Sequence, residues 1–281
     1  MLKVAIPNKG SLSDSAIAML KEAGYRQRSD VRDLVLIDNE NDIEFYYLRP
    51  RDIALYVASG ELEAGITGRD LLIDSGAEAT ESLQLDFGKS TFRFAAPATE
   101  TWSVEKLANK RIATAYPGLV QNYLDKAKIQ AQVVKLDGAV ETSVRLGVAD
   151  VIADVVSTGG TLRQAGLAIF GEPILQSEAI VIERAAASLD VRVDTLKRRL
   201  QGVVIAKQYV LVDYDVEDKF LEEACRLTPG IESPTVSALA KPGWSAVRSM
   251  VPKSEINRMM DSLWAVGARG ILVTDIHACR L

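Results

Sequence analysis

The sequence has very few of the residue types that commonly build disulfides, metal sites and nucleophilic relays. It contains two cysteines and one histidine among 281 residues. Cys225 and Cys279 lie far apart without metal-ligand spacing, so we expect two buried, unpaired thiols rather than a disulfide or a zinc site. His277 has no second histidine to work with, so we expect a strand residue of the last domain and exclude a Ser-His or Cys-His relay. Any chemistry must therefore rest on positioning and electrostatics.

Excess positive charge and long apolar runs are also absent. The net charge is -5 and the isoelectric point is near 5.2, which argues against a nucleic-acid or membrane-surface partner. No apolar run reaches membrane-spanning length and no early segment has signal-peptide character, so we expect a cytoplasmic protein. With 48% hydrophobic residues the chain can build sizeable cores, and its length suggests about two domains. An anionic substrate would need a local basic cluster.

The most informative stretch combines an apolar strand with a polar loop. Residues 151–156 form an apolar run interrupted only by Asp154, which predicts a strand buried on both faces of a parallel sheet. Small hydroxyls and glycines follow directly: Ser157, Thr158, Gly159, Gly160 and Thr161. Hydroxyls, main-chain N–H groups and the start of a following helix are donors that hold a phosphate dianion. The loop therefore predicts a phosphate cradle, although an ordinary polar turn has the same composition.

Asp154 favours the phosphate interpretation of this loop. An unpaired carboxylate inside an apolar strand is costly, so its presence indicates a ligand. At the carboxyl end of the strand it can accept hydrogen bonds from the 2- and 3-hydroxyls of a ribose whose 5-phosphate occupies the loop. Acid and loop together predict a site for ribose 5-phosphate.

Three basic residues occupy loops between predicted strands and helices. Lys9 follows the first predicted strand, and Arg49 and Arg51 flank Pro50 after the second. Helix N-termini favour anions, and guanidinium groups bind phosphate oxygens through paired hydrogen bonds. We expect an anion clamp; the alternatives are a solvated lysine and an exposed, salt-bridging arginine pair.

Three further residues are candidates for substrate binding. Asp70 is either the N-cap of a short helix or a ligand contact. Tyr116 follows a strand as Lys9 does, and it either packs on a base or fills a surface groove. Glu141 is either a ligand contact or a charge at a helix terminus.

The order of strand, loop and helix units predicts an α/β fold with two lobes. A bilobal catalytic part like that of periplasmic binding proteins fits this layout better than one long sheet. The ligand would lie in the cleft where loops at the carboxyl ends of the strands converge. We assign residues 1–91 and 179–208 to lobe I, and residues 92–178, which contain the phosphate loop, to lobe II.

The tail, residues 209–281, is an independent unit in this reading. Its predicted order is strand, helix, strand, strand, helix, strand (βαββαβ), the split ferredoxin-like pattern. Nothing in it has the composition of a phosphate or metal site. Regulation or assembly is therefore its expected task.

A set of positions around the central stretch carries a resemblance to a known family. They are Glu141, Gly147, Ala149, Ile152, Asp154, Val155, Thr158, Gly159, Thr161 and Leu162. With PNKGSL near the start and RIATAYPGLV at residues 111–120, they resemble ATP phosphoribosyltransferase, the enzyme that opens histidine biosynthesis. The resemblance extends over the whole chain and includes the C-terminal regulatory domain of the family's long form.

The resemblance implies a reaction and its partners. Phosphoribosyl pyrophosphate and ATP would be joined at adenine N1 with release of pyrophosphate, and Mg²⁺ would be carried mainly by the substrate phosphates. The chain would form a homo-oligomer, dimer and hexamer. Asp154, Lys9 and Arg49 would serve catalysis. The substrate contacts would be Arg51, Asp70, Tyr116, Glu141, Ser157, Thr158, Gly159, Gly160 and Thr161.

The resemblance also implies feedback inhibition by histidine through the tail. The effector contacts would be Asp215, Ile231, Ser233, Thr235 and Gly270. Asp215 can accept the amino or imidazole proton, Thr235 can form a hydrogen bond, and Gly270 leaves room for a ring; alternatively, all five are only turn and strand-end residues. The sequence departs from the family at two places, because Gly160 lies where relatives often have arginine and Gly270 where alanine is common.

Two other function classes fit parts of the sequence. One is a solute-binding protein with the same two-lobed outline, which the absence of a signal peptide and the basic residues facing the cleft argue against. The other is a stand-alone amino-acid sensor built on the tail, which leaves the phosphate loop unexplained.

Overall fold

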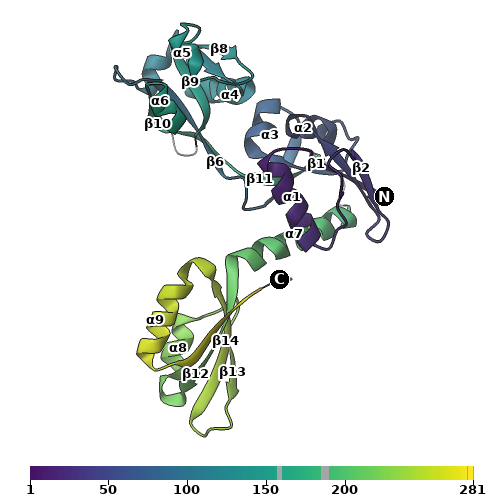
Figure 1. The fold of residues 1–281 in the computed structure, drawn as a ribbon, viewed down its shortest axis with the longest axis vertical. Helices are drawn as coiled ribbons and strands as arrows, with labels where there is room; N and C mark the ends of the chain where they lie inside the picture. Colours follow the sequence, from purple (N-terminus) through teal and green to yellow (C-terminus); the bar gives the residue numbers. More distant parts are fainter. Residues whose placement is uncertain (157–159, 185–189, 277, 281) are drawn as a thin grey trace. The chain divides into compact units, whose positions relative to one another are not determined.

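The computed structural model describes residues 1–156, 160–184, 190–276 and 278–280, and it divides into two compact units (Figure 1). The first unit comprises Met1–Lys21 and Tyr25–Lys197, and the second comprises Glu22–Gly24 and Arg198–Leu281. No helix in the described ranges is both long enough and apolar enough to cross a membrane.

One lobe of the first unit is built on a six-stranded sheet in the order β2-β3-β1-β4-β11-β5. Its strands are β1 (Leu2–Pro7), β2 (Val35–Asp38), β3 (Ile43–Leu48), β4 (Ala64–Gly68), β5 (Ala79–Gln84) and β11 (Ala179–Arg184), and its helices are α1 (Ser11–Glu22), α2 (Pro50–Ala58) and α3 (Arg69–Ser75). β1 pairs in parallel with β3 and β4. The loops after Pro7, Leu48 and Gly68 therefore lie at the same edge of the sheet.

The other lobe of the first unit has a five-stranded sheet in the order β10-β6-β9-β7-β8. Its strands are β6 (Ser90–Pro97), β7 (Arg111–Thr114), β8 (Gln132–Lys135), β9 (Val151–Val156) and β10 (Leu167–Ser177), and its helices are η1 (Val104–Leu107), α4 (Pro117–Ala127), α5 (Thr142–Arg145) and α6 (Gly160–Gln164). β7 pairs in parallel with β8 and β9, whereas β6 runs antiparallel to β9 and β10.

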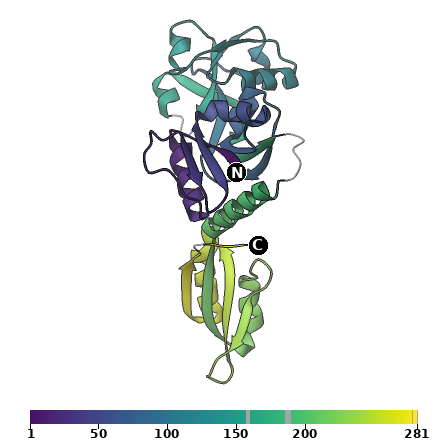
Figure 2. The same cartoon turned by 90° about the vertical axis from the view of Figure 1, so that its right-hand side faces the viewer.

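The chain passes between the two lobes twice. It leaves the first sheet after β5, enters β6, and returns from β10 to β11 (Figures 1 and 2). The pairing of β10 with β6 shifts register between Phe170 and Leu175. The bilobal α/β architecture expected from the sequence is confirmed, while the exact lobe boundaries stay predictions.

Local sequence explains the elements that hold the cleft loops. Val151, Ile152 and Ala153 of β9 are buried, as an apolar run between two neighbouring strands requires. Pro50 occupies the first turn of α2, and Arg49 before it is extended with φ -65° and ψ 133°. Proline disfavours the helical region for the preceding residue, so Arg49 stays outside the helix beside the cleft.

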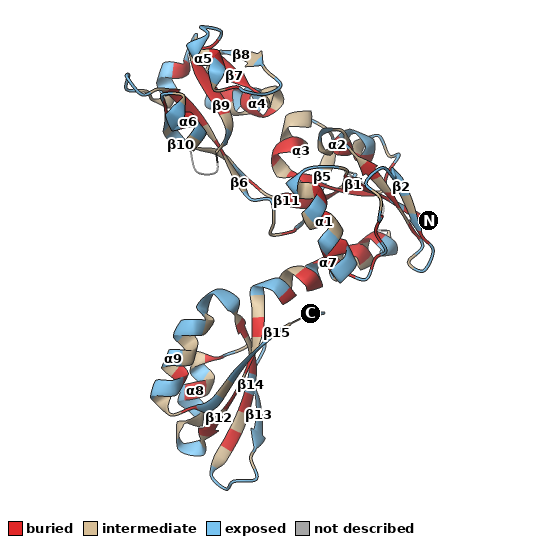
Figure 3. Cartoon of the chain, in the orientation of Figure 1, coloured by how far each residue is buried: buried red, intermediate tan, exposed pale blue. Residues whose placement is uncertain are grey.

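The second unit has four antiparallel strands in the order β13-β14-β12-β15. Its elements are β12 (Tyr209–Glu217), η2 (Asp218–Phe220), α8 (Leu221–Leu227), β13 (Thr235–Ala238), β14 (Trp244–Pro252), η3 (Lys253–Glu255), α9 (Ile256–Val266) and β15 (Arg269–Asp275), and α7 (Val191–Gln208) leads into it. Alternate residues of β12 pack with Ala224 of α8 and Leu263 of α9 in one core. β13 and β15 are largely exposed (Figure 3). The ferredoxin-like βαββαβ pattern is confirmed.

The predictions for the two cysteines are confirmed in part, and the prediction for the single histidine is not tested. Cys225 and Cys279 are unpaired, as expected. Both are partly exposed, however, so the prediction that they are buried is wrong. Cys225 lies at the margin of the core between α8 and the sheet, which leaves one side of the thiol open. His277 lies outside the described residues.

Candidate functional site

A cavity of about 460 Å³ lies at the carboxyl ends of the parallel strands in the first unit. It is lined by Lys9, Gly10, Ser11, Leu12, Arg49, Pro50, Arg51, Asp52, Leu71 and Tyr116. The loop after β1, the starts of α1, α2 and α4, and α3 supply these side chains. The structure thus brings together Lys9, Arg49, Arg51 and Tyr116, which the sequence placed in four separate loops.

Arg51 and Tyr116 are in direct contact within this cavity. The guanidinium carbon of Arg51 lies 4.6 Å from the centre of the Tyr116 ring. The ring also meets Phe92 edge-on, with 5.3 Å between centroids. Arg51 forms an ion pair with Asp74, with 3.2 Å between Nη1 and Oδ2. Of the two arginines only Arg51 matches the salt-bridging alternative, because Arg49 pairs with no acid among the described residues.

Asp70 is a buried residue of α3 rather than its N-cap. Gly68 occupies the N-cap position without a side-chain hydrogen bond. Asp70 is 8% exposed. Its Oδ1 accepts a hydrogen bond from Ser177 Oγ at 2.9 Å, and its backbone N–H donates to Ser177 Oγ at 3.0 Å. The capping alternative is therefore wrong, because the carboxylate is held by β10. Burial, followed by the charge of Asp70, raises the pKa of the Tyr116 phenol.

Asp154 lies in β9 with its Oδ1 accepting a hydrogen bond from the N–H of Val155 at 2.8 Å. Burial is the main cause that raises the pKa of this carboxyl group, and the charge of Glu141 adds to the rise. Arg51 acts in the opposite direction. Asp154 therefore shares its electrostatic surroundings with both residues, one from each lobe.

Glu141 occupies the N-cap position of α5 and makes no side-chain capping hydrogen bond. The alternative of a simple charge at a helix terminus thus describes its location, and its role as a ligand contact stays a prediction.

Of the five residues of the predicted phosphate loop, the structure describes the last two. Ser157, Thr158 and Gly159 lie outside the described residues. Gly160 and Thr161, the last two residues of the predicted loop, are the first residues of α6 instead. Their proposed phosphate contacts stay predictions.

Arg28 is a buried residue of this region that sequence reasoning missed. It is 6% exposed and lies over the ring of Tyr47 at 4.0 Å. Its Nη2 donates to the backbone oxygen of Asn8 at 2.8 Å, and its Nη1 donates to the backbone oxygens of Val31 and Asp33. Arg28 therefore fixes the chain directly before Lys9. Only its position in an arginine-rich segment distinguished it in the sequence.

In the second unit, two of the predicted effector residues are neighbours. Asp215 lies on β12 and Gly270 on β15; a Cβ atom on Gly270 would stand 3.5 Å from Asp215 Oδ2. Gly270 has φ +61°, a conformation that side chains other than glycine adopt with strain. The backbone conformation therefore favours glycine here, whereas a Cβ atom would make only an ordinary van der Waals contact with Asp215.

The other three predicted effector residues lie beyond α8. Ile231 and Ser233 are in the loop that leads to β13, and Thr235 is the first residue of that strand. Thr235 is opposite Arg248 of β14, whose Nε donates to Asp213 Oδ1 at 2.7 Å. Sequence reasoning missed this ion pair, because its two partners are far apart in the chain.

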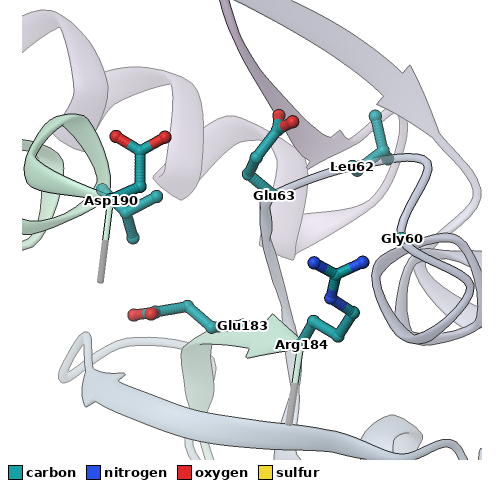
Figure 4. Close-up of a pocket in the computed structure, with 7 residues that line it drawn as sticks. Gly60, Leu62, Glu63, Glu183, Arg184 and Asp190 are labelled. Carbon is teal, nitrogen blue, oxygen red and sulfur yellow. The ribbon is translucent and has the colours of Figure 1, made fainter. Parts of the chain in front are cut away.

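A smaller pocket of about 110 Å³ lies at the opposite edge of the first sheet, before β4 and after β11 (Figure 4). Its carboxylates include Glu63 and Glu183, and both are engaged. Glu63 accepts the N–H of Lys3 at 2.7 Å, and Glu183 forms an ion pair with Lys197 at 2.9 Å. Three acids against one arginine make this pocket unsuitable for a phosphorylated substrate.

Fold and cavity together define a two-lobed α/β enzyme unit with a basic cleft and a separate ferredoxin-like domain. The model of the ATP phosphoribosyltransferase family matches residues 49–202, and the model of that family's C-terminal domain matches residues 206–278. The chain belongs to the ATP phosphoribosyltransferase family. It is a transferase of histidine biosynthesis, so neither the solute-binding nor the stand-alone sensor interpretation holds for the whole chain.

Individual relatives agree with this assignment. ATP phosphoribosyltransferases of Pseudarthrobacter chlorophenolicus and of Arthrobacter sp. strain FB24 are each 61% identical to this chain, with full coverage on both sides. Among solved structures, the ATP phosphoribosyl transferase (HisG:HisZ) complex from Thermotoga maritima superposes with a TM-score of 0.62 at 26% identity. That match covers 73% of this chain and 98% of the solved one.

Proposed function

We propose that the enzyme transfers the phosphoribosyl group of phosphoribosyl pyrophosphate to N1 of ATP and releases pyrophosphate, the first step of histidine biosynthesis. The observation that carries this proposal is the cavity in which Lys9, Arg49 and Arg51 meet at the strand ends of a protein with net charge -5. Such a local basic cluster suits two substrates that are both polyphosphates.

The proposed chemistry needs no general base. The N1 lone pair forms the bond to the anomeric carbon while the bond from that carbon to pyrophosphate breaks, and its electron pair leaves with pyrophosphate. Catalysis then reduces to aligning N1 with the anomeric carbon and stabilising the departing charge. This agrees with a sequence that has one histidine.

The residues divide between the two substrates in this proposal. Asp154 accepts the ribose hydroxyls, and residues 157–161 hold the 5-phosphate. Lys9 and Arg49 stabilise the pyrophosphate, while Arg51 and Tyr116 meet ATP. Asp70 and Glu141 complete the substrate contacts. The raised pKa of Asp154 supports its role, because a buried carboxylate with one backbone donor gains from hydroxyl donors of a ligand.

Mg²⁺ enters the proposal as part of the substrates. No group of three or more acidic, cysteine or histidine side chains within the described ranges is arranged to hold a metal ion. The cavity offers cationic side chains, which suit phosphate oxygens rather than a metal. We infer that Mg²⁺ enters the cleft bound to the substrate phosphates, with water molecules as its other ligands.

Turnover tests the proposed reaction. The protein is mixed with ATP, phosphoribosyl pyrophosphate, Mg²⁺ and a pyrophosphatase, and ultraviolet absorbance is followed. We expect a continuous change that requires all substrates. A protein that binds both substrates but leaves the absorbance flat would contradict the proposed transfer.

We further propose that histidine inhibits the enzyme through the second unit. In this proposal the enzyme is cytoplasmic and forms homo-oligomers, both a dimer and a hexamer. The close approach of Asp215 and Gly270 supports an effector pocket there. If histidine favours an inactive arrangement of the oligomer, a coupling free energy of about 1 to 3 kcal/mol between the two sites is enough. The coupling is reciprocal, so substrate must weaken histidine binding by the same factor.

Replacing Asp215 or Thr235 by alanine tests this regulatory site. We expect turnover without histidine to stay close to that of the wild type, while the histidine concentration for half inhibition rises roughly tenfold, as for loss of a charge-assisted hydrogen bond. Glu222→Ala on α8 is a matched control, because this side chain is 90% exposed. If both variants and the wild type respond alike to millimolar histidine, the regulatory site lies elsewhere or is absent.

A further inference from the structure

Asp74 of α3 is bonded to both lobes of the first unit at once. Its Oδ2 pairs with Arg51 Nη1 at 3.2 Å, and its Oδ1 accepts the N–H groups of Gly118 at 2.9 Å and Leu119 at 3.2 Å. The side chain is only 12% exposed. One carboxylate thus joins the start of α2 to the start of α4.

The start of α4 needs an acceptor from outside the helix. Tyr116 occupies its N-cap position and makes no side-chain capping hydrogen bond, and Pro117 has no N–H to offer. The next two N–H groups have no partner within a helix of this kind, so they require another acceptor. Asp74 supplies it from 44 and 45 residues away in sequence.

Gly118 allows the two segments to approach closely enough for these bonds. A Cβ atom at this position would lie 2.2 Å from the backbone oxygen of Asp74 and 3.1 Å from its carbonyl carbon. Both are backbone atoms, so a side chain could be accommodated only by moving α3 away from α4. The requirement for glycine is therefore one of space.

The contacts of Asp74 affect two residues that line the cavity. Arg51, which pairs with Asp74, lies over the ring of Tyr116. Tyr116 directly precedes the start of α4, whose N–H groups donate to Asp74 as well. We propose that Asp74 is a positioning residue that fixes Arg51 and Tyr116 in one arrangement for ATP. The identity of this ligand rests on the proposed function.

Asp74→Ala and Gly118→Ala disturb the same contact from its two sides. We expect each to raise the KM and the Kd for ATP roughly tenfold, the size of one charge-assisted hydrogen bond, with kcat changed less than the KM. Asp74→Asn keeps an acceptor for the N–H groups and loses the charge opposite Arg51, so its effect should be smaller. Asp125→Ala is the matched control, because Asp125 is an exposed carboxylate of α4.

Melting temperature separates positioning from mere stability. Alanine has a higher helix propensity than glycine, so Gly118→Ala should favour α4 itself while it separates α4 from α3. We expect this variant to remain fully folded at the assay temperature, so that a raised KM reports positioning and not unfolding. The double variant should bind ATP no more weakly than the weaker single variant, because either change already breaks the contact.

Amide hydrogen exchange of Gly118 and Leu119 tests the contact without any substrate. We expect Asp74→Ala to accelerate exchange at both amides and Asp125→Ala to leave them unchanged. If exchange accelerates but the Kd for ATP stays at the wild-type value, Asp74 is only a helix cap and the proposal is overturned. Unchanged exchange also overturns it. If the wild type shows no transfer while the variants bind ATP more weakly, the positioning role stands and the proposed reaction fails.

Discussion

Asp154→Asn should lower kcat/KM for phosphoribosyl pyrophosphate by roughly a hundredfold or more, because charge-assisted hydrogen bonds to two ribose hydroxyls contribute about 1.5 to 3 kcal/mol each. Asparagine keeps the shape of the side chain and removes its charge. Steady-state kinetics with varied phosphoribosyl pyrophosphate measures the effect. Asp150→Asn is a matched control, because Asp150 lies one residue before the same strand and pairs with Arg111 instead.

The Asp150→Asn control should affect stability rather than kinetics. Arg111 lowers the pKa of Asp150, so this pair stabilises the fold above the ordinary pKa of aspartate and the contribution is lost as pH falls through the lowered value. At neutral pH the control should lose at most about 1 kcal/mol of stability and keep its kinetics. A folded Asp154→Asn variant with near-normal kcat/KM would remove Asp154 from the ribose site.

The pH profile gives a second reading of Asp154. Burial, with Glu141 next, raises the pKa of its carboxyl group, so the group accepts a proton at a higher pH than an exposed aspartate does. The affinity for phosphoribosyl pyrophosphate should therefore fall as pH decreases through this raised value. In Asp154→Asn the dependence should be absent, and an unchanged acidic limb would assign it to another group.

Arg49→Ala should lower kcat/KM by about ten- to a hundredfold, the equivalent of one hydrogen bond between charged groups. Arg49 lines the cavity and pairs with no acid among the described residues, so its charge is available for phosphate. Its loss should barely change the melting temperature. Kinetics and thermal unfolding of the same preparation measure both quantities.

Arg226→Ala serves as the control for removing an arginine. Arg226 is 72% exposed and lies on α8 in the second unit, so both kinetics and melting temperature should remain close to wild type. If Arg49→Ala instead melts far below the wild type and retains its kinetics, Arg49 is a structural residue and the anion clamp loses its central member.

Sequence patterns predicted those parts of the fold in which local periodicity and burial agree. The apolar run of β9, the proline at the start of α2 and the βαββαβ order of the tail were all visible. The strands β2, β5 and β10 were not predicted. β2 and β5 lie at the edges of their sheet, and much of β10 is exposed, so their residues do not form a strong apolar pattern.

The candidate site was predictable as a set of residue types but not as a set of contacts. Lys9, Arg49, Arg51 and Tyr116 could be found because each follows a strand. Asp74 could not, because Arg51 is 23 residues away, Gly118 and Leu119 lie in the other lobe, and nothing in α3 distinguishes Asp74 from a solvated acid. Asp70 was open to the wrong capping interpretation for the same reason, since its partner Ser177 is 107 residues away.

The transfer itself is tested most directly by identifying its product. The protein is incubated with ATP, phosphoribosyl pyrophosphate and Mg²⁺, and the nucleotide product is analysed by mass spectrometry and by nuclear magnetic resonance of the adenine ring. We predict ATP carrying one ribose 5-phosphate on N1, formed in equal amount to pyrophosphate. Pyrophosphate released without this adduct, or an adduct at another atom of ATP, would contradict it.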